Sequence, residues 1–307
     1  MLTSLSFTPR SYSGEQDLQA IADLLNLCKR FDQEDLYYSV NTLKQDYSSP
    51  EFDPNRDLQL WEDTNGRLVA VGSLWMPAVQ TQVEGFLGID VHPQVRDGCL
   101  EDEILNWGTQ RLQQVSQTHH LPAGLYSGCR EHRTKRIAWL QRCGFTSTRC
   151  FLRMSPSLTH LPPMQLPQGF TIRDGCEGID DPAWVDLYNQ TFVDHWNFHP
   201  ATLELVQHWT KDPDYMPALD LVAIDSDGTY AGFCYCHIDS GENHHLGRKE
   251  GWISSLGTRR GYRRLGLGRA LLIAGLDRLQ AAGMETALLG VDPQNQRGCE
   301  NSRGCQW

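Results

Sequence analysis

The sequence predicts an α/β protein in which a unit of strands and helices around a mixed sheet occurs twice. A length of 307 residues suggests two domains, since single domains usually hold about 100–200 residues. Residues 155–167 carry four prolines and no apolar period, which predicts a stiff, extended linker. Strand and helix patterns follow in a similar order on both sides of it. We therefore expect one domain over residues 1–154 and a second over residues 168–307.

In the first half, apolar residues three and four positions apart predict helices, and short apolar runs predict strands. Asn65-Gly66 lies between two such runs and indicates a hairpin. The expected helices span residues 14–30, 100–115 and 133–142. The expected strands span residues 58–61, 68–72, 83–91, 124–127 and 146–154.

The second half repeats this order, with Asp227-Gly228 as the hairpin signal. Pro182 lies in the first turn of one expected helix, and Gly283 follows the end of another. The expected helices span residues 182–193 and 266–282. The expected strands span residues 170–173, 219–224, 230–238, 251–256 and 286–291.

Composition limits the functions that the chain can have. A net charge of −11 disfavours general binding to nucleic acid, because an acidic surface repels phosphodiesters. No apolar run is long enough to span a membrane, and the first residues do not resemble a signal peptide, so we expect a cytoplasmic protein. The ten cysteines are scattered, which predicts reduced thiols and no metal site. The pair Cys234 and Cys236 is read as core residues rather than as half of a metal site.

Positive charge is concentrated in one short segment, where a loop joins a predicted strand to a predicted helix. Five arginines occur between Arg259 and Arg269 in this acidic chain. Gly266 and Gly268 lack a side chain, so a ligand can approach the backbone closely there. The first N–H groups of a helix have no intrahelical partner and favour anions. The segment therefore predicts a cradle for a pyrophosphate.

This segment, Arg263-Arg264-Leu265-Gly266-Leu267-Gly268, resembles the Arg/Gln-x-x-Gly-x-Gly/Ala motif of the GNAT N-acetyltransferases. The resemblance implies two tandem GNAT domains and acetyl-CoA, or another acyl-CoA, as the donor. It places the pyrophosphate on the amides of residues 264–269 and the pantetheine arm along a strand edge at residues 256–258. The implied donor-binding residues are Leu256, Gly257, Thr258, Arg263, Arg264, Leu265, Gly266, Leu267, Gly268, Arg269 and Asn295.

The first half departs from the motif at the matching place. Counted from Arg96, Cys99 and Glu101 stand where the two glycines would be, and Asp97 and Asp102 add negative charge. Carboxylates beside a phosphate are repulsive. We therefore expect the first half to be a non-catalytic copy.

Transfer of an acyl group to an amine needs a base for the amine proton and an acid for the leaving thiolate. Glu250 is the carboxylate nearest the motif on the preceding strand, and it shares a face with residues 252 and 254 if that strand is regular. The alternative is that Glu250 is a solvated residue at the start of the strand, beside Arg248 and Lys249, with no role in catalysis. The expected acceptor is the amine of a small molecule, with residues 194–200 shaping its pocket. A catalytically impaired module that only binds acyl-CoA stays open, as does the choice between monomer and homodimer.

The last residues of the chain do not resemble the ending of a GNAT domain. The family's usual acid is a tyrosine on a helix after the Val-Asp-x-x-Asn segment, and residues 296–307 contain no tyrosine. We therefore expect the second domain to lack its final helix and hairpin. A frameshift or a truncated gene model after Arg297 is the hypothesis that explains this tail.

Overall fold

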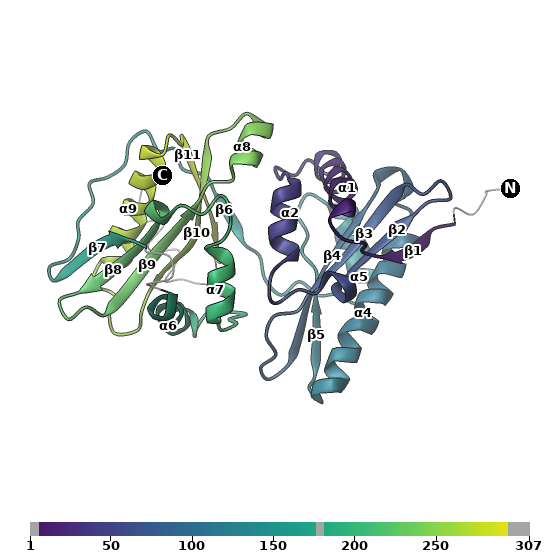
Figure 1. Cartoon of the computed structure of the whole chain (residues 1–307), viewed down its shortest axis with the longest axis horizontal. Coiled ribbons are helices and arrows are strands. Elements are labelled where there is room, and N and C mark those ends of the chain that lie inside the picture. Colours follow the sequence, from purple (N-terminus) through teal and green to yellow (C-terminus); the bar gives the residue numbers. More distant parts are fainter. Residues whose placement is uncertain (1–5, 176–180, 294–307) are drawn as a thin grey trace. The chain divides into compact units, whose positions relative to one another are not determined.

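The computed structural model describes residues 6–175 and 181–293, which divide into two compact units between Thr146 and Ser147. Each unit contains one mixed β-sheet with helices on both faces (Figure 1). The α/β class with two mixed sheets, predicted from the sequence, is confirmed. Within the described ranges, no helix combines the length and apolar character that crossing a bilayer requires.

The first unit has a five-stranded sheet in the order β1-β2-β3-β4-β5. Only β4 and β5 run parallel, and the other neighbours are antiparallel. The strands are β1 (Thr8–Ser11), β2 (Leu58–Glu62), β3 (Leu68–Trp75), β4 (Val83–Val91) and β5 (Ala123–Tyr126). The helices are α1 (Leu18–Phe31), α2 (Val40–Tyr47), α3 (Pro54–Asp57), α4 (Cys99–His119) and α5 (Thr134–Arg142).

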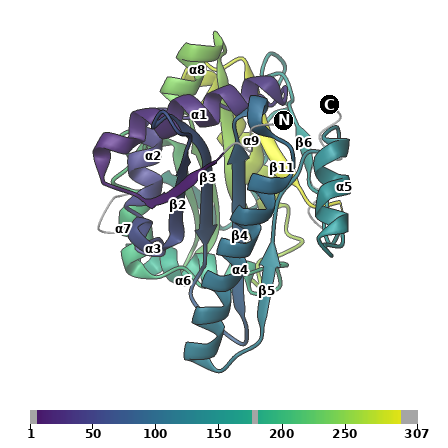
Figure 2. The ribbon, with the colours of Figure 1, turned by 90° about the vertical axis from the view of Figure 1, so that its right-hand side faces the viewer.

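Two apolar clusters fill the space on either side of the first sheet. Leu100 and Ile104 of α4 pack with Leu87 of β4 in one cluster, and α4 runs along β4 (Figure 2). Leu18 and Ile21 of α1 belong to the other. Helices on both faces explain why β3 and β4 are largely buried rather than exposed on one side.

The second unit has a six-stranded sheet in the order β6-β11-β10-β9-β8-β7, in which only β10 and β11 run parallel. The strands are β6 (Leu152–Met154), β7 (Phe170–Asp174), β8 (Asp220–Asp225), β9 (Tyr230–His237), β10 (Glu250–Thr258) and β11 (Thr286–Val291). The helices are α6 (Asp181–Phe192), α7 (Leu203–Trp209), α8 (Ser240–Leu246) and α9 (Leu267–Ala281).

Helix α9 covers one face of the second sheet, and α6 covers the other. A Cβ atom on Gly275 would lie 2.6 Å from the Sγ atom of Cys234 and 2.9 Å from that of Cys236, so α9 approaches β9 very closely there. Both cysteines are fully buried in this core, as the sequence indicated. On the other face, Trp184 of α6 packs against Phe233 of β9. Packing of α9 on one face and α6 on the other fixes the position of β10 and of the loop that follows it.

The strand expected over residues 146–154 as the last strand of the first half belongs to the second sheet. The structure places only residues 152–154 in a strand, β6, which pairs antiparallel with β11 through Leu152 and Val291. Its short apolar run predicted a strand correctly, but its partner lies about 140 residues further along the chain, where local pattern gives no information. Strand β1 and helices α2, α3, α7 and α8 were not predicted.

The proline-rich segment, residues 155–167, packs on the second unit instead of spanning free space. Leu158 is only 1% exposed and lies in the same core as α9. Its backbone N–H donates to the carbonyl of Glu285, and its carbonyl accepts from the Gln280 side chain. The prolines stiffen a segment that is anchored in the core of the second unit at Leu158.

The burial of Leu158 predicts a stability effect that a free linker would not show. We expect Leu158→Ala to lower the free energy of unfolding of the second unit by about 2–5 kcal/mol, because it removes buried methyl groups and leaves a cavity. Met164→Ala, at a position 44% exposed in the same segment, is the matched control and should change it by less than about 0.5 kcal/mol. Urea unfolding of the full chain measures both. Equal effects of the two substitutions would contradict this packing.

Candidate active site

Strand β10 has an edge that loses its neighbour halfway along. It pairs with β11 only from Glu250 to Ile253, opposite Thr286 to Leu289. After that β11 continues beside β6, and β10 from Ser254 to Thr258 has no strand on that side among the described residues. Unpaired backbone groups on a strand edge are free to bind an extended ligand. The predicted pantetheine-binding residues, Leu256, Gly257 and Thr258, lie on this unpaired part.

A bulge occurs where the two strands part. On the β9 side, Ile253 pairs with Cys236 but Ser255 pairs with Tyr235, so Ser254 is an extra residue. The expectation that residues 250, 252 and 254 share one face assumed a regular strand, and the bulge ends that regularity at Ser254. Beyond the bulge Ser255 and Gly257 take the face of Trp252, the face that α6 covers.

The unpaired edge leads into the glycine-containing start of α9. Gly266 is the N-cap residue with φ 86°, a left-handed conformation that favours glycine. A Cβ atom there would meet only Pro167, at 3.8 Å, so the backbone is accessible. The first amides of α9 have no acceptor within the helix. The helix start at Gly266 is thus open at the place where the sequence predicts an anion site over residues 264–269.

Three of the five arginines in this segment are bound by acidic side chains of the same unit. Arg259 pairs with Asp186 of α6. Arg260 and Arg263 both pair with Asp194, which follows α6, at 3.0 Å and 3.1 Å. In the described part of the chain, Arg264 and Arg269 have no such partner. These two guanidinium groups are therefore the ones available to a phosphate.

Arg263 holds the loop in place as well. Its Nη2 atom donates to the carbonyl of Thr191 at 2.9 Å, and its Nε atom donates to the carbonyl of Thr258 at 3.2 Å. It therefore joins the end of β10 to the end of α6. The sequence predicted only a donor-binding role for Arg263. Its contacts with Thr191 and Asp194 could not be predicted, because these residues are about 70 positions away in the chain.

The two guanidinium groups beside Asp194 give a pH prediction. Hydrogen bonds from Arg260 and Arg263 lower the pKa of Asp194 to about 2. Because this pKa lies below the unfolded value of about 3.9, the ion pairs stabilise the fold in full above about pH 4 and are lost as the pH falls toward 2. We expect a carbon-13 NMR titration of the Asp194 carboxyl to give a midpoint near 2, and Arg260→Ala/Arg263→Ala to raise it. An ordinary midpoint in the unmodified chain would contradict these contacts.

Glu250, the candidate base, lies at the start of β10. Its carboxylate is 3.5 Å from Arg248 and 3.8 Å from Arg153, and its side chain is 25% exposed. At about 3.3 Å per residue, the backbone of Glu250 lies roughly 20 Å along the strand from Leu256. Glu250 therefore lies near the bulge and far from the start of α9.

The segment after β11 was expected to contribute Asn295. Asp292, in the same Val-Asp-x-x-Asn segment, is buried and lies 3.6 Å from Arg149. Asn295 itself, and the tail from residue 294 on, lie outside the described residues. Trp196, in the segment expected to shape an acceptor pocket, contacts the rings of Phe151 and the guanidinium of Arg149.

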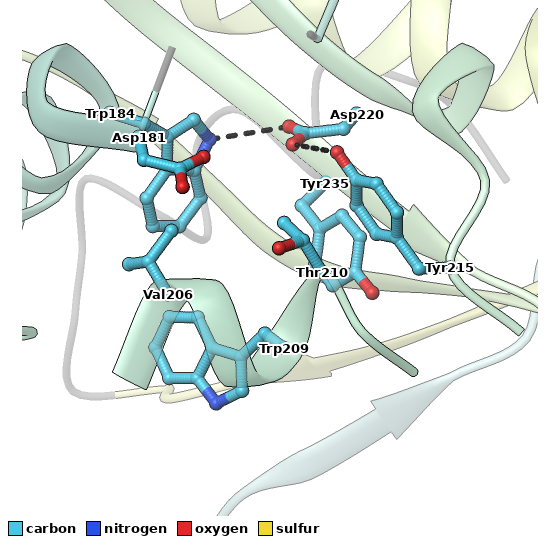
Figure 3. Close-up of a pocket in the computed structure, with 8 residues that line it drawn as sticks. All are labelled: Asp181, Trp184, Val206, Trp209, Thr210, Tyr215, Asp220 and Tyr235. Atoms are coloured by element: carbon cyan, nitrogen blue, oxygen red, sulfur yellow. Dashed lines mark hydrogen bonds between the residues drawn. The ribbon is translucent and has the colours of Figure 1, made fainter. Parts of the chain in front are cut away.

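An aromatic cavity that the sequence did not reveal lies on the α6 and α7 side of the sheet (Figure 3). The carboxylate of Asp220 accepts hydrogen bonds from Trp184 at 3.3 Å and from Tyr215 at 3.1 Å. The volume is about 30 Å³, which is room for about two water molecules. A whole substrate does not fit in this volume. The cluster instead packs α6 and α7 against the sheet through the contacts of its aromatic side chains. Its lining residues are Asp181, Trp184, Val206, Trp209, Thr210, Tyr215, Asp220 and Tyr235.

In the first unit the corresponding edge and helix start are occupied by the chain itself. Strand β4 pairs with β5 only from Val83 to Phe86. Beyond that point Ser127 donates to the carbonyl of Leu87, and Arg96 donates to that of Val91 at 2.6 Å. At the start of α4, the Glu101 carboxylate accepts from the N–H of Gly98. Glu101, one of the acidic residues predicted to exclude a phosphate, therefore binds an amide that a phosphate would otherwise reach.

The comparisons with known proteins agree with this geometry. The model of the acetyltransferase (GNAT) family matches residues 182–300. The second unit of the chain is therefore similar to the GNAT acetyltransferases over most of its length. The match contains the whole of β10 and α9, and therefore the unpaired edge and the helix start.

Relatives and solved structures extend the likeness. A mycothiol acetyltransferase from Frankia alni is 33% identical over 168 residues, which cover 51% of this chain and 49% of the relative. One from Pseudarthrobacter chlorophenolicus is 26% identical and covers 69% and 63%. The chain thus spans about half the length of the first of these relatives.

Solved structures match nearly the whole chain and show its fold. A GCN5-related N-acetyltransferase from Sphaerobacter thermophilus has a TM-score of 0.72 at 24% identity, covering 94% of this chain and 88% of that one. A tandem GNAT protein from the clavulanic acid biosynthesis pathway has a TM-score of 0.66 at 12% identity, covering 98% and 94%. N-myristoyltransferase from Saccharomyces cerevisiae, solved with myristoyl-CoA bound, has 0.64 at 14%, covering 99% and 77%. This chain has the tandem GNAT fold.

Proposed function

We propose that the second unit binds acetyl-CoA and transfers its acetyl group to the primary amine of a small molecule. The observation that carries this proposal is the continuity of two features. The unpaired edge of β10 leads directly into the open, glycine-started helix α9, beside the unpaired guanidinium groups of Arg264 and Arg269. The edge suits the amide-bearing arm of the donor, and the helix start suits its pyrophosphate.

The reaction forms a bond between the amine nitrogen and the acetyl carbon and breaks the bond between that carbon and sulfur. A backbone N–H on the unpaired part of β10 polarises the acetyl carbonyl. Glu250 takes the proton that the amine loses, directly or through water. The leaving thiolate takes a proton to become free CoA. The first unit takes no part in these steps.

Release of free CoA thiol tests the function. We expect the full chain to release thiol from acetyl-CoA when amines are supplied, and Arg264→Ala/Arg269→Ala to abolish this at low donor concentration. Arg278→Ala, in the last turn of the same helix, is the control and should react normally. Because relatives carry the name mycothiol acetyltransferase, the amine that gives mycothiol on acetylation is the first acceptor to test. Tight binding without thiol release from any amine would favour a module that only binds acyl-CoA.

The proposed role of Glu250 has a separate test. We expect Glu250→Gln to lower kcat at least tenfold without weakening acetyl-CoA binding, because a neutral amide cannot accept the proton. Rate at saturating donor and binding by calorimetry measure the two quantities. Glu285→Gln, a change at an exposed ion pair with Lys249, controls for the loss of one charge. An unchanged kcat in Glu250→Gln would remove Glu250 from the reaction.

A further inference from the structure

A groove lies between the proline-rich segment and the first turns of α9, within the second unit. Its volume is about 580 Å³, within the usual range for small-molecule sites. One wall is formed by Pro162, Pro163, Gln165, Leu166 and Pro167. The other is formed by Leu265, Gly266, Arg269, Ala270 and Ile273.

The proline-rich wall is fixed by packing at both ends. Near one end, Leu158 is buried in the core beside α9. At the other, Pro167 lies close to Gly266, at 3.8 Å from the position of a Cβ atom there. Leu161 and Leu166 also pack on this core. Four prolines over this stretch limit the backbone further, so the wall is formed before any ligand arrives.

The groove and the expected pyrophosphate site share residues. Gly266 caps α9 and also lines the groove, and Arg269 lies in the first turn of the helix and in the groove wall. Leu265 is 51% exposed beside them, although it is a large apolar residue. An anion at the helix start therefore has, directly next to it, an apolar surface and an unpaired guanidinium group. That combination suits a nucleotide, whose base is flat and apolar and whose sugar carries phosphate.

We propose that this groove takes the nucleotide end of the acyl-CoA, so that the proline-rich segment forms a wall of the donor site. The adenine packs between the prolines and Leu265, and Arg269 binds the phosphate on the ribose. This rests on the proposed function, because it assumes that acetyl-CoA is the donor. It assigns a binding role to residues 162–167, which the sequence presents only as a linker.

Calorimetric titration of the full chain with three donors tests the proposal. Acetyl-CoA carries the whole nucleotide, acetyl-3′-dephospho-CoA lacks the ribose phosphate, and S-acetylpantetheine lacks the nucleotide. Gln165→Glu places a negative charge in the groove wall, and we expect it to weaken acetyl-CoA binding about fivefold and S-acetylpantetheine binding not at all. Gln168→Glu makes the same change three residues further on, outside the groove, and should leave both unchanged.

Arg269→Gln provides the second arm. We expect the unmodified chain to bind acetyl-CoA about tenfold more tightly than its dephospho form, and this preference to vanish in Arg269→Gln. If the unmodified chain binds acetyl-CoA but Gln165→Glu and Gln168→Glu change its affinity equally, the groove proposal is overturned. The assignment of acetyl-CoA as the donor then stays intact. No binding of acetyl-CoA by the unmodified, folded chain would overturn both. Thermal unfolding of each variant confirms that it is folded.

Discussion

Replacing Gly266 with glutamate is expected to weaken acetyl-CoA binding by more than about a hundredfold. Three effects act together at this N-cap residue. A side chain there must adopt φ 86°, which costs about 1–2 kcal/mol for residues other than glycine. The new side chain enters the open space in front of the first amides of α9. Its carboxylate also repels the pyrophosphate that we place there. Calorimetry with the full chain measures the loss.

Gly283→Glu is the matched control, because Gly283 follows the other end of the same helix. Its φ is 87°, and a Cβ atom there meets nothing within 4 Å, so the substitution carries the same strain into equally open space. A carboxylate near a helix C-terminus is also unfavourable, so the control is at least as demanding for stability. We expect Gly283→Glu to bind acetyl-CoA normally if it folds. Similar losses in both variants would show that strain, and not the phosphate site, is being measured.

A substitution at Gly257 is expected to destabilise the second unit by forcing two of its elements apart. A Cβ atom on Gly257 would lie 2.1 Å from the Cγ2 atom of Thr191 on α6, which real Cβ atoms essentially never show. Either α6 or β10 must shift, so Gly257→Ala should lower the free energy of unfolding of the second unit by about 1–3 kcal/mol. Thr191→Ser removes that methyl group. We expect the double variant to recover most of the loss.

Gly290→Ala shows whether alanine in a strand has an effect by itself. Gly290 is on β11, it is exposed, and a Cβ atom there meets nothing within 4 Å. Urea unfolding of the full chain should show a change of less than about 0.5 kcal/mol for this control. If Gly257→Ala matched the control, or if Thr191→Ser restored nothing, α6 would not be held against β10 as described.

The elements that local signals define were predictable from the sequence. Helix α9 has a capping glycine at each end and an apolar face, and it was placed within one residue at each end. The hairpin between β8 and β9 follows from Asp227-Gly228. Local pattern could not give the partner of β6, because strand pairing is decided by the packing of distant segments. For the same reason the bulge at Ser254, which reverses the faces of β10, was missed.

The candidate site also has features that the local sequence predicts and features that depend on distant residues. Glycine and arginine in one short segment were enough to predict an anion site, because the helix start supplies the donors itself. Five arginines look alike in that segment, however, and only the folded chain brings Asp186 and Asp194 to three of them. The groove wall at Pro162–Pro167 was likewise invisible, since prolines predict stiffness but give no information about what lies beside them.

The position of β6 also decides which residues connect the two units. The segment that looks like a linker, with its four prolines, packs on the core of the second unit and belongs to it. Phe145 still packs in the first core, and the strand that follows at Leu152 already belongs to the other sheet. Arg149 already pairs with Asp292 of the second unit, so residues 146–148 are the stretch that joins the two units. A substitution in the proline-rich segment is therefore expected to act within the second unit.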